Sequence, residues 1–161
     1  MRCFRVFLIW IAVTVFGPHV LHAQDPPEYA IDTGRHLSPG CDTLPVYAYF
    51  QVKGKYPESS ASLAKRADVM LAGHKTYTDA NGYITFQVLI DCRGKMAAVK
   101  LLQTDARYEA CFFPAGLVEA LYAFLLSLNA WKPAMAAGRP VNYKAYLSFK
   151  LEAGHVVQVS P

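Results

Sequence analysis

The segment of residues 130–141 and the alternating stretch that follows it constrain the fold of this chain most strongly. Trp131 adds a large amphipathic ring, and Pro133 stops a preceding helix because proline has no backbone N–H to donate. Two further residues are typical of a tight connection, Gly138 and Pro140. We therefore expect a helix to end in this segment and a strand to begin at Val141.

Residues 141–151 alternate between apolar and polar side chains, which is the period of a strand with one buried face. The side chains predicted to face the core are Val141, Tyr143, Ala145, Leu147, Phe149 and Leu151. Those predicted to face outward are Asn142, Lys144, Tyr146, Ser148 and Lys150. Gly154 ends the strand, and residues 155–159 are expected to form a short tail strand.

A helix is predicted between a serine cap at Ser59 or Ser60 and a glycine stop at Gly73. Its apolar residues recur at helical spacing: Leu63, Ala67, Met70 and Leu71. A second helix is predicted over residues 114–128, with a leucine-rich stripe that needs cover on more than one side.

A β-hairpin is predicted between the two helices. Residues 83–91 alternate, residues 91–95 form a turn that contains Gly94, and residues 96–103 return as the paired strand. With a strand expected over residues 46–52, the order is strand, helix, hairpin, helix, strand. This order predicts an α+β fold with an antiparallel sheet and two helices packed on one face.

The N-terminus has the pattern of a secretory signal peptide over residues 1–23. Arg2 and Arg5 precede an apolar run, and a small residue, Ala23, offers a cleavage site. The competing interpretation is a retained membrane anchor, but the run is shorter than the roughly 20 residues that span a bilayer. We expect export across the inner membrane to the periplasm. Residues 24–45 then form an irregular, proline-rich lead-in to a domain of residues 46–161.

Composition argues against nucleic-acid binding. The net charge of +4 falls to +2 when Arg2 and Arg5 leave with the signal peptide, and the lysines are dispersed rather than clustered. No nucleic-acid partner is expected.

Export would permit a disulfide among the three cysteines of the mature chain, Cys41, Cys92 and Cys111. An odd number leaves one of them outside any bridge within the chain. Cys92 can pair with Cys41 or with Cys111. We favour Cys41 with Cys92, because this bridge would join the irregular lead-in to the body of the domain.

The sequence offers no group of residues suited to catalysis. His36 and Cys41 lack the further ligand pair that a zinc site needs, and Cys111 has no base among its sequence neighbours. Phosphate-loop, nucleophile-elbow and paired-cysteine motifs are absent from the sequence. We expect no catalytic residue, no bound metal and no cofactor, and the chain is not expected to be an enzyme.

Several of these features occur together in one order, and together they resemble the TonB C-terminal domain family. They are the run GYITFQVLIDCRGK at residues 82–95, the segment WKPA at residues 131–134 and the segment GRPV at residues 138–141, which leads into the last strand. Tyr56 and Pro57 stand where that family often has the same pair. The resemblance implies a periplasmic module that binds an extended segment of an outer-membrane transporter by adding a strand to its sheet.

The resemblance places the partner-binding edge on the last strand. The residues that it implies are Val141, Asn142, Tyr143, Lys144, Tyr146, Ser148 and Lys150. The partner would be a protein of the cell envelope, or a second copy in an edge-paired homodimer. A cleaved signal peptide and a lead-in of about 22 residues depart from the anchored, long-spaced energy transducer. The alternative function is therefore a stand-alone structural or accessory envelope protein without energy transduction.

Overall fold

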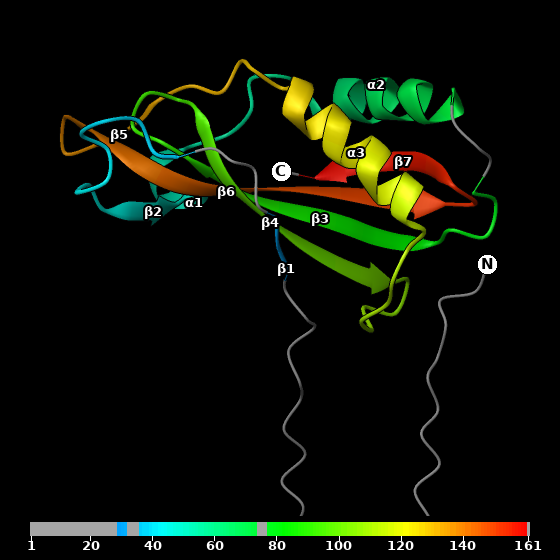
Figure 1. Ribbon diagram of the computed structural model, residues 1–161. Coiled ribbons are helices and arrows are strands. Elements are labelled where there is room, and N and C mark those ends of the chain that lie inside the picture. Colours follow the sequence, from blue (N-terminus) through cyan, green and yellow to red (C-terminus); the bar gives the residue numbers. More distant parts are fainter. Residues whose placement is uncertain (1–28, 32–35, 74–76, 161) are drawn as a thin grey trace, which may run out of the picture.

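The computed structural model describes residues 29–31, 36–73 and 77–160, so the predicted signal peptide lies outside the described residues. The elements follow in chain order: β1 (Tyr29–Ile31), β2 (Val46–Ala48), α1 (Tyr49–Val52), α2 (Ser60–Ala72), β3 (Gly82–Ile90), β4 (Met96–Asp105), α3 (Ala115–Ser127), β5 (Ala134–Ala136), β6 (Arg139–Glu152) and β7 (His155–Ser160). Helices and strands are segregated into layers, which is the predicted α+β class (Figure 1).

The sheet is mixed rather than purely antiparallel, so that part of the prediction is wrong. Its strand order is β1-β4-β3-β6-β2, and β5 and β7 also pair with β6. The pairs β1–β4, β4–β3, β3–β6 and β6–β7 are antiparallel, whereas β2 runs parallel to β6. β2 directly follows the lead-in and reaches β6 without a hairpin, which allows the parallel direction.

The two long helices cover one face of the sheet, as predicted. Figure 1 shows α2 and α3 above the strands, with β2, α1 and β5 gathered at the left end. The buried stripe of α3 packs on the alternating inward residues of β3 and β6. Phe149 lies between Phe86 and Phe124 with both ring centroids 5.9 Å away in edge-to-face geometry, a favourable arrangement for aromatic pairs.

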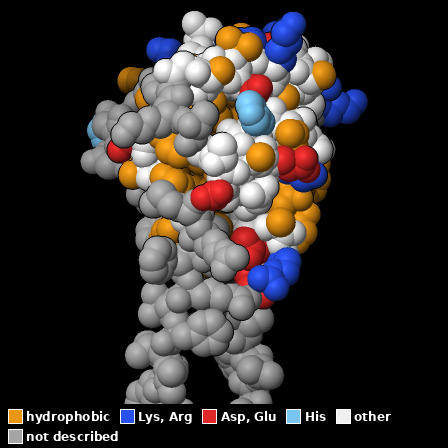
Figure 2. Space-filling model, turned by 90° about the vertical axis from the view of Figure 1, so that its right-hand side faces the viewer, with side chains coloured by type: hydrophobic (Ala, Val, Ile, Leu, Met, Phe, Trp, Pro, Cys, Tyr) orange, Lys and Arg blue, Asp and Glu red, His pale blue; other side chains and the backbone are white. Residues whose placement is uncertain are grey.

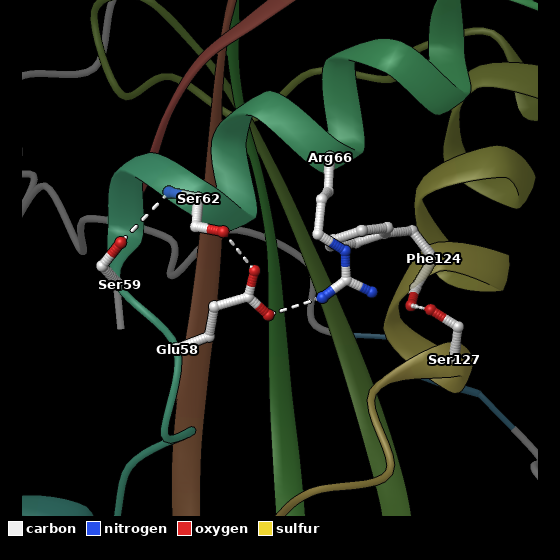
Figure 3. Close-up of polar contacts among 6 residues, drawn as sticks. All are labelled: Glu58, Ser59, Ser62, Arg66, Phe124 and Ser127. Carbon is white, nitrogen blue, oxygen red and sulfur yellow. Dashed lines mark hydrogen bonds and ion pairs between the residues drawn. The ribbon is translucent and has the colours of Figure 1, made fainter.

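The start of α2 is capped and tied to α3. Ser59 accepts a hydrogen bond from the backbone N–H of Ser62 at 3.2 Å, which satisfies one of the free donors of the first turn. Glu58 accepts from the Ser62 hydroxyl and pairs with Arg66, whose guanidinium lies 5.4 Å from the ring centroid of Phe124. Figure 3 shows these side chains bridging the two helices.

The β3–β4 turn is organised by a buried aspartate. Asp91 accepts backbone hydrogen bonds from Arg93 and Lys95 through one oxygen and from Ser38 through the other. Burial alone would raise the pKa of this carboxyl group, but the hydrogen bonds outweigh it and hold the pKa below its ordinary value. Gly94, with φ of 78°, supplies the left-handed residue that closes the turn.

Two segments differ from the sequence-based expectation. Residues 46–52 were predicted as one strand, but β2 ends at Ala48 and the short helix α1 follows. The lead-in was predicted to be irregular, yet its residues 29–31 form β1, which pairs with Val99 to Leu101 of β4. Both segments are too short to show a period in the sequence, and pairing with a distant strand decides their structure.

The segment of residues 130–141 forms a small hairpin. α3 ends before it, β5 pairs with the start of β6, and Ala137 and Gly138 make the turn with positive φ values of 48° and 76°. β6 therefore begins at Arg139, two residues earlier than predicted. Trp131 is buried beside Tyr56, with ring centroids 5.1 Å apart.

Candidate functional site

Strand β6 has neighbours on both sides along most of its length. β3 pairs with residues 143–151 on the inner edge, while on the outer edge β2 covers residues 142–144 and β7 covers residues 148–152. The expectation that the last long strand is an open edge is therefore wrong. The lead-in and the tail fold back onto it, and neither contact can be inferred from the alternation of β6 itself.

The side chains of β6 alternate as predicted, with one exception. The inward set is buried: Val141, Tyr143, Ala145, Leu147, Phe149 and Leu151. On the opposite face, Lys144 and Tyr146 are exposed, and Ser148 and Lys150 are half-buried. The exception is Asn142, which was expected to face outward but is only 1% exposed. The partner-binding role of these residues stays a prediction.

Asn142 closes one end of the outer edge. Its Nδ2 donates to the carbonyl oxygens of Cys41 and Leu44 at 2.7 Å and 3.2 Å, and its Oδ1 accepts from the backbone N–H of Cys92 at 2.9 Å. Cys41 and Cys92 are joined by a disulfide, the pairing favoured from the sequence, and Cys111 lies outside this bridge. The disulfide and the hydrogen bonds of Asn142 thus join the lead-in, the β3–β4 turn and β6.

The outer edge of β6 is interrupted between β2 and β7, at residues 145–147. Asn142 donates its backbone N–H outward, to Pro45. Because β6 pairs with β3 in regular antiparallel register, backbone direction alternates along it, and Lys144 and Tyr146 point the same way as Asn142. The N–H and C=O of Tyr146 therefore face the gap. Within the described parts of the chain, neither β2 nor β7 pairs with Tyr146, and no turn or loop backbone group bonds to it.

A pocket of about 140 Å³ opens at this interruption, on the helix side of the sheet. Its wall comes from α1, the start of α2, the Trp131 segment and β6: Tyr49, Gly54, Lys55, Tyr56, Glu58, Ser59, Ser60, Leu63, Trp131, Ala145, Tyr146 and Leu147. The acidic oxygens of Glu58 are already engaged by Ser62 and Arg66 (Figure 3). What remains is an apolar and aromatic lining with few free polar groups.

Trp131, one of the lining residues, carries an unusual polar group. The residue is 7% exposed, and its indole Nε1–H is buried without a hydrogen-bond partner among the residues that the structure describes. A buried donor left unpaired costs about 1–3 kcal/mol. Such a group is rare enough in folded proteins to need a reason.

Gly54, one of the lining residues, packs against the ring of Tyr143. A Cβ added to Gly54 would lie 2.5 Å from two carbons of the Tyr143 ring, so glycine is required for this close packing. Burial raises the pKa of Tyr143 to about 12, so its hydroxyl stays protonated near neutral pH and donates to the Lys132 carbonyl at 3.0 Å. Tyr143 thereby connects β6 to the segment that contains Trp131.

The side chain of Tyr146 is held on the opposite face of the sheet. Its hydroxyl accepts a hydrogen bond from Gln87 Nε2 at 2.6 Å, and its ring meets that of Tyr49 edge-on at a centroid distance of 6.2 Å. These contacts turn the ring away from the helix side. The backbone groups of Tyr146 are therefore left facing the gap while its side chain is engaged elsewhere.

Among the described residues, His, Cys, Asp and Glu side chains form no cluster that could hold a metal ion. No helix in the described part of the chain is long and apolar enough to cross a membrane. Figure 2 shows basic side chains standing apart on one face of the molecule, with hydrophobic and acidic side chains between them.

Comparison of the chain with protein-family models, curated proteins and solved structures finds no match. The resemblance to the TonB C-terminal domain therefore enters the functional assignment only as a proposal.

Sequence reasoning found the strand that carries the site but missed the pocket. Its lining comes from residues as far apart as Tyr49, Leu63, Trp131 and Leu147, and no local pattern joins them. Tyr56 gave a partial signal, because the Tyr-Pro pair stood out in the sequence, but its contact with Trp131 is visible only in three dimensions.

Proposed function

We propose that this chain is an exported, non-enzymatic protein-binding module of the cell envelope, which holds an extended segment of a partner protein at the interruption in the outer edge of β6. The observation that carries the proposal is the outward-facing N–H and C=O of Tyr146, which are unpaired among the described residues. A peptide backbone offers the complementary acceptor and donor. The resemblance to the TonB C-terminal domain supports the same mode and suggests an outer-membrane transporter as the partner.

The geometry limits how far the added segment can pair. A full strand beside β6 would require β2 or β7 to leave. β2 is the weaker cover, because it has three residues and the following α1 contains no buried residue. Short pairing at Tyr146 is therefore the first contact, and displacement of β2 would lengthen it. An edge-paired homodimer is less favoured, because β2 or β7 would have to leave the edge of β6 in both copies.

Two substitutions of Tyr146 separate backbone pairing from side-chain contacts. Tyr146→Pro removes the outward N–H without removing a hydrogen bond to β3, and it is expected to weaken peptide binding about tenfold. Tyr146→Phe keeps the N–H, loses only the hydroxyl that accepts from Gln87, and should bind within about twofold of the native protein.

The measurement begins with selection of peptides from a displayed library on protein purified from cells that express the full chain. A selected peptide is then mapped by ¹⁵N–¹H NMR, and its affinity is compared between the two variants, whose spectra also report folding. Shifts centred on Tyr146 with loss of affinity in Tyr146→Pro support the proposal. Selected peptides that map elsewhere, or bind both variants equally, would contradict it and favour the stand-alone structural or accessory alternative.

A further inference from the structure

The pocket beside Tyr146 lies where a side chain of a paired segment would point. A residue directly opposite Tyr146 places its own side chain on the Tyr146 side of the sheet, because paired residues share a face. The residues before and after it then point to the helix side, where Ala145 and Leu147 line the pocket. Backbone pairing and pocket entry are thus compatible in one extended segment.

We infer that this pocket is the specificity site for one aromatic side chain of the partner segment, next to the residue that pairs with Tyr146. The inference rests on the proposed function and adds the class of residue that is recognised. A volume of about 140 Å³ matches a single ring, since an apolar protein cavity of about 150 Å³ accommodates benzene. The lining residues Tyr56, Leu63 and Leu147 are apolar or aromatic over this volume.

The polar groups at the pocket agree with a peptide ligand. Trp131 lines the pocket, so the NMR signal of its indole N–H reports on a side chain that enters there. Glu58 cannot easily receive a basic side chain, because Ser62 and Arg66 already occupy its oxygens. An acidic side chain would meet the carboxylate of Glu58 as well as the ammonium group of Lys55, because both residues line the pocket, and these opposite charges offset each other. A neutral aromatic anchor is therefore the best match.

The test uses three capped tripeptides with a common frame, acetyl-Thr-Phe-Thr-amide, acetyl-Thr-Ala-Thr-amide and acetyl-Thr-Glu-Thr-amide. Each is titrated into the ¹⁵N-labelled protein purified from cells that express the full chain. The phenylalanine probe is expected to bind at least about tenfold more tightly than the alanine probe, because binding removes the apolar surface of its ring from water. It should shift both the Tyr146 amide and the Trp131 indole N–H.

A matched pair of variants at the start of α2 tests the location. Ser60 is exposed and lines the pocket, so Ser60→Trp is expected to fill the mouth and abolish the preference for phenylalanine. Ala61 is exposed but does not line it, so Ala61→Trp should leave the preference unchanged.

The outcomes separate this inference from the proposed function. If the three probes shift Tyr146 with equal affinity, or Ser60→Trp keeps the preference for phenylalanine, the pocket has no such role although backbone pairing stands. If the phenylalanine probe shifts the Trp131 indole while the Tyr146 amide stays still, the pocket binds rings but strand pairing at β6 is contradicted.

Discussion

Replacing both Cys41 and Cys92 with serine is expected to lower the free energy of unfolding by about 4 kcal/mol. The bridge closes a loop with a sequence separation of 51 residues, and a cross-link over a loop of that length removes about this much chain entropy from the unfolded state. Urea denaturation of the native and the doubly substituted protein measures the difference.

Cys111→Ser is the matched control for this change, because Cys111 lies outside the bridge. It should leave the denaturation midpoint nearly unchanged. A reducing agent should reproduce the effect of the double substitution in the native protein and have none in the doubly substituted one. A midpoint that is the same with and without the bridge would show that the lead-in adds nothing to the stability of the domain.

Replacing Asn142 with leucine is expected to lower the free energy of unfolding by about 3 kcal/mol. The substitution leaves the Cys41 and Leu44 carbonyls and the Cys92 N–H without the side chain that satisfies them. Each such group costs about 1–3 kcal/mol when buried, and the Cys41 carbonyl keeps a second donor, the Leu44 N–H. Urea denaturation again provides the measurement.

Lys144→Leu is the control on the same strand and face, because Lys144 is exposed and is not one of the partners of the Asn142 side chain. Its effect should lie within about 0.5 kcal/mol. If Asn142→Leu lowers the free energy of unfolding no more than Lys144→Leu does, the buried hydrogen bonds do not hold the lead-in on β6. Because the disulfide and Asn142 hold the same segment, the combined loss should be smaller than the sum of the two.

The elements with long or well-punctuated patterns could be predicted from the sequence. The alternation of residues 83–90 and 141–151 and the cap at Ser59 each depend on nearby residues, and β3, β6 and α2 formed accordingly. The favoured disulfide followed from the need to join the lead-in to the body. Local physical chemistry was sufficient in these cases.

The parts that could not be predicted depend on contacts between distant residues. Asn142 lies on the polar side of an alternating strand, and only its partners at Cys41, Leu44 and Cys92 explain why it is buried. The edge status of β6 likewise depends on β2 and β7, whose short sequences give no pairing signal. The sequence predicts a candidate site of seven residues on the last strand. The site proposed from the structure consists of the backbone N–H and C=O of Tyr146 and the pocket beside them.

The central claim is that the outer edge of β6 is open at Tyr146. Amide hydrogen exchange of the free protein, followed by NMR, tests it without knowledge of the partner. Ala145 and Leu147 direct their N–H groups toward β3, so their amides should be strongly protected. The Tyr146 amide should exchange at least about tenfold faster although it lies between them. Protection of Tyr146 equal to that of Ala145 and Leu147 would contradict the account.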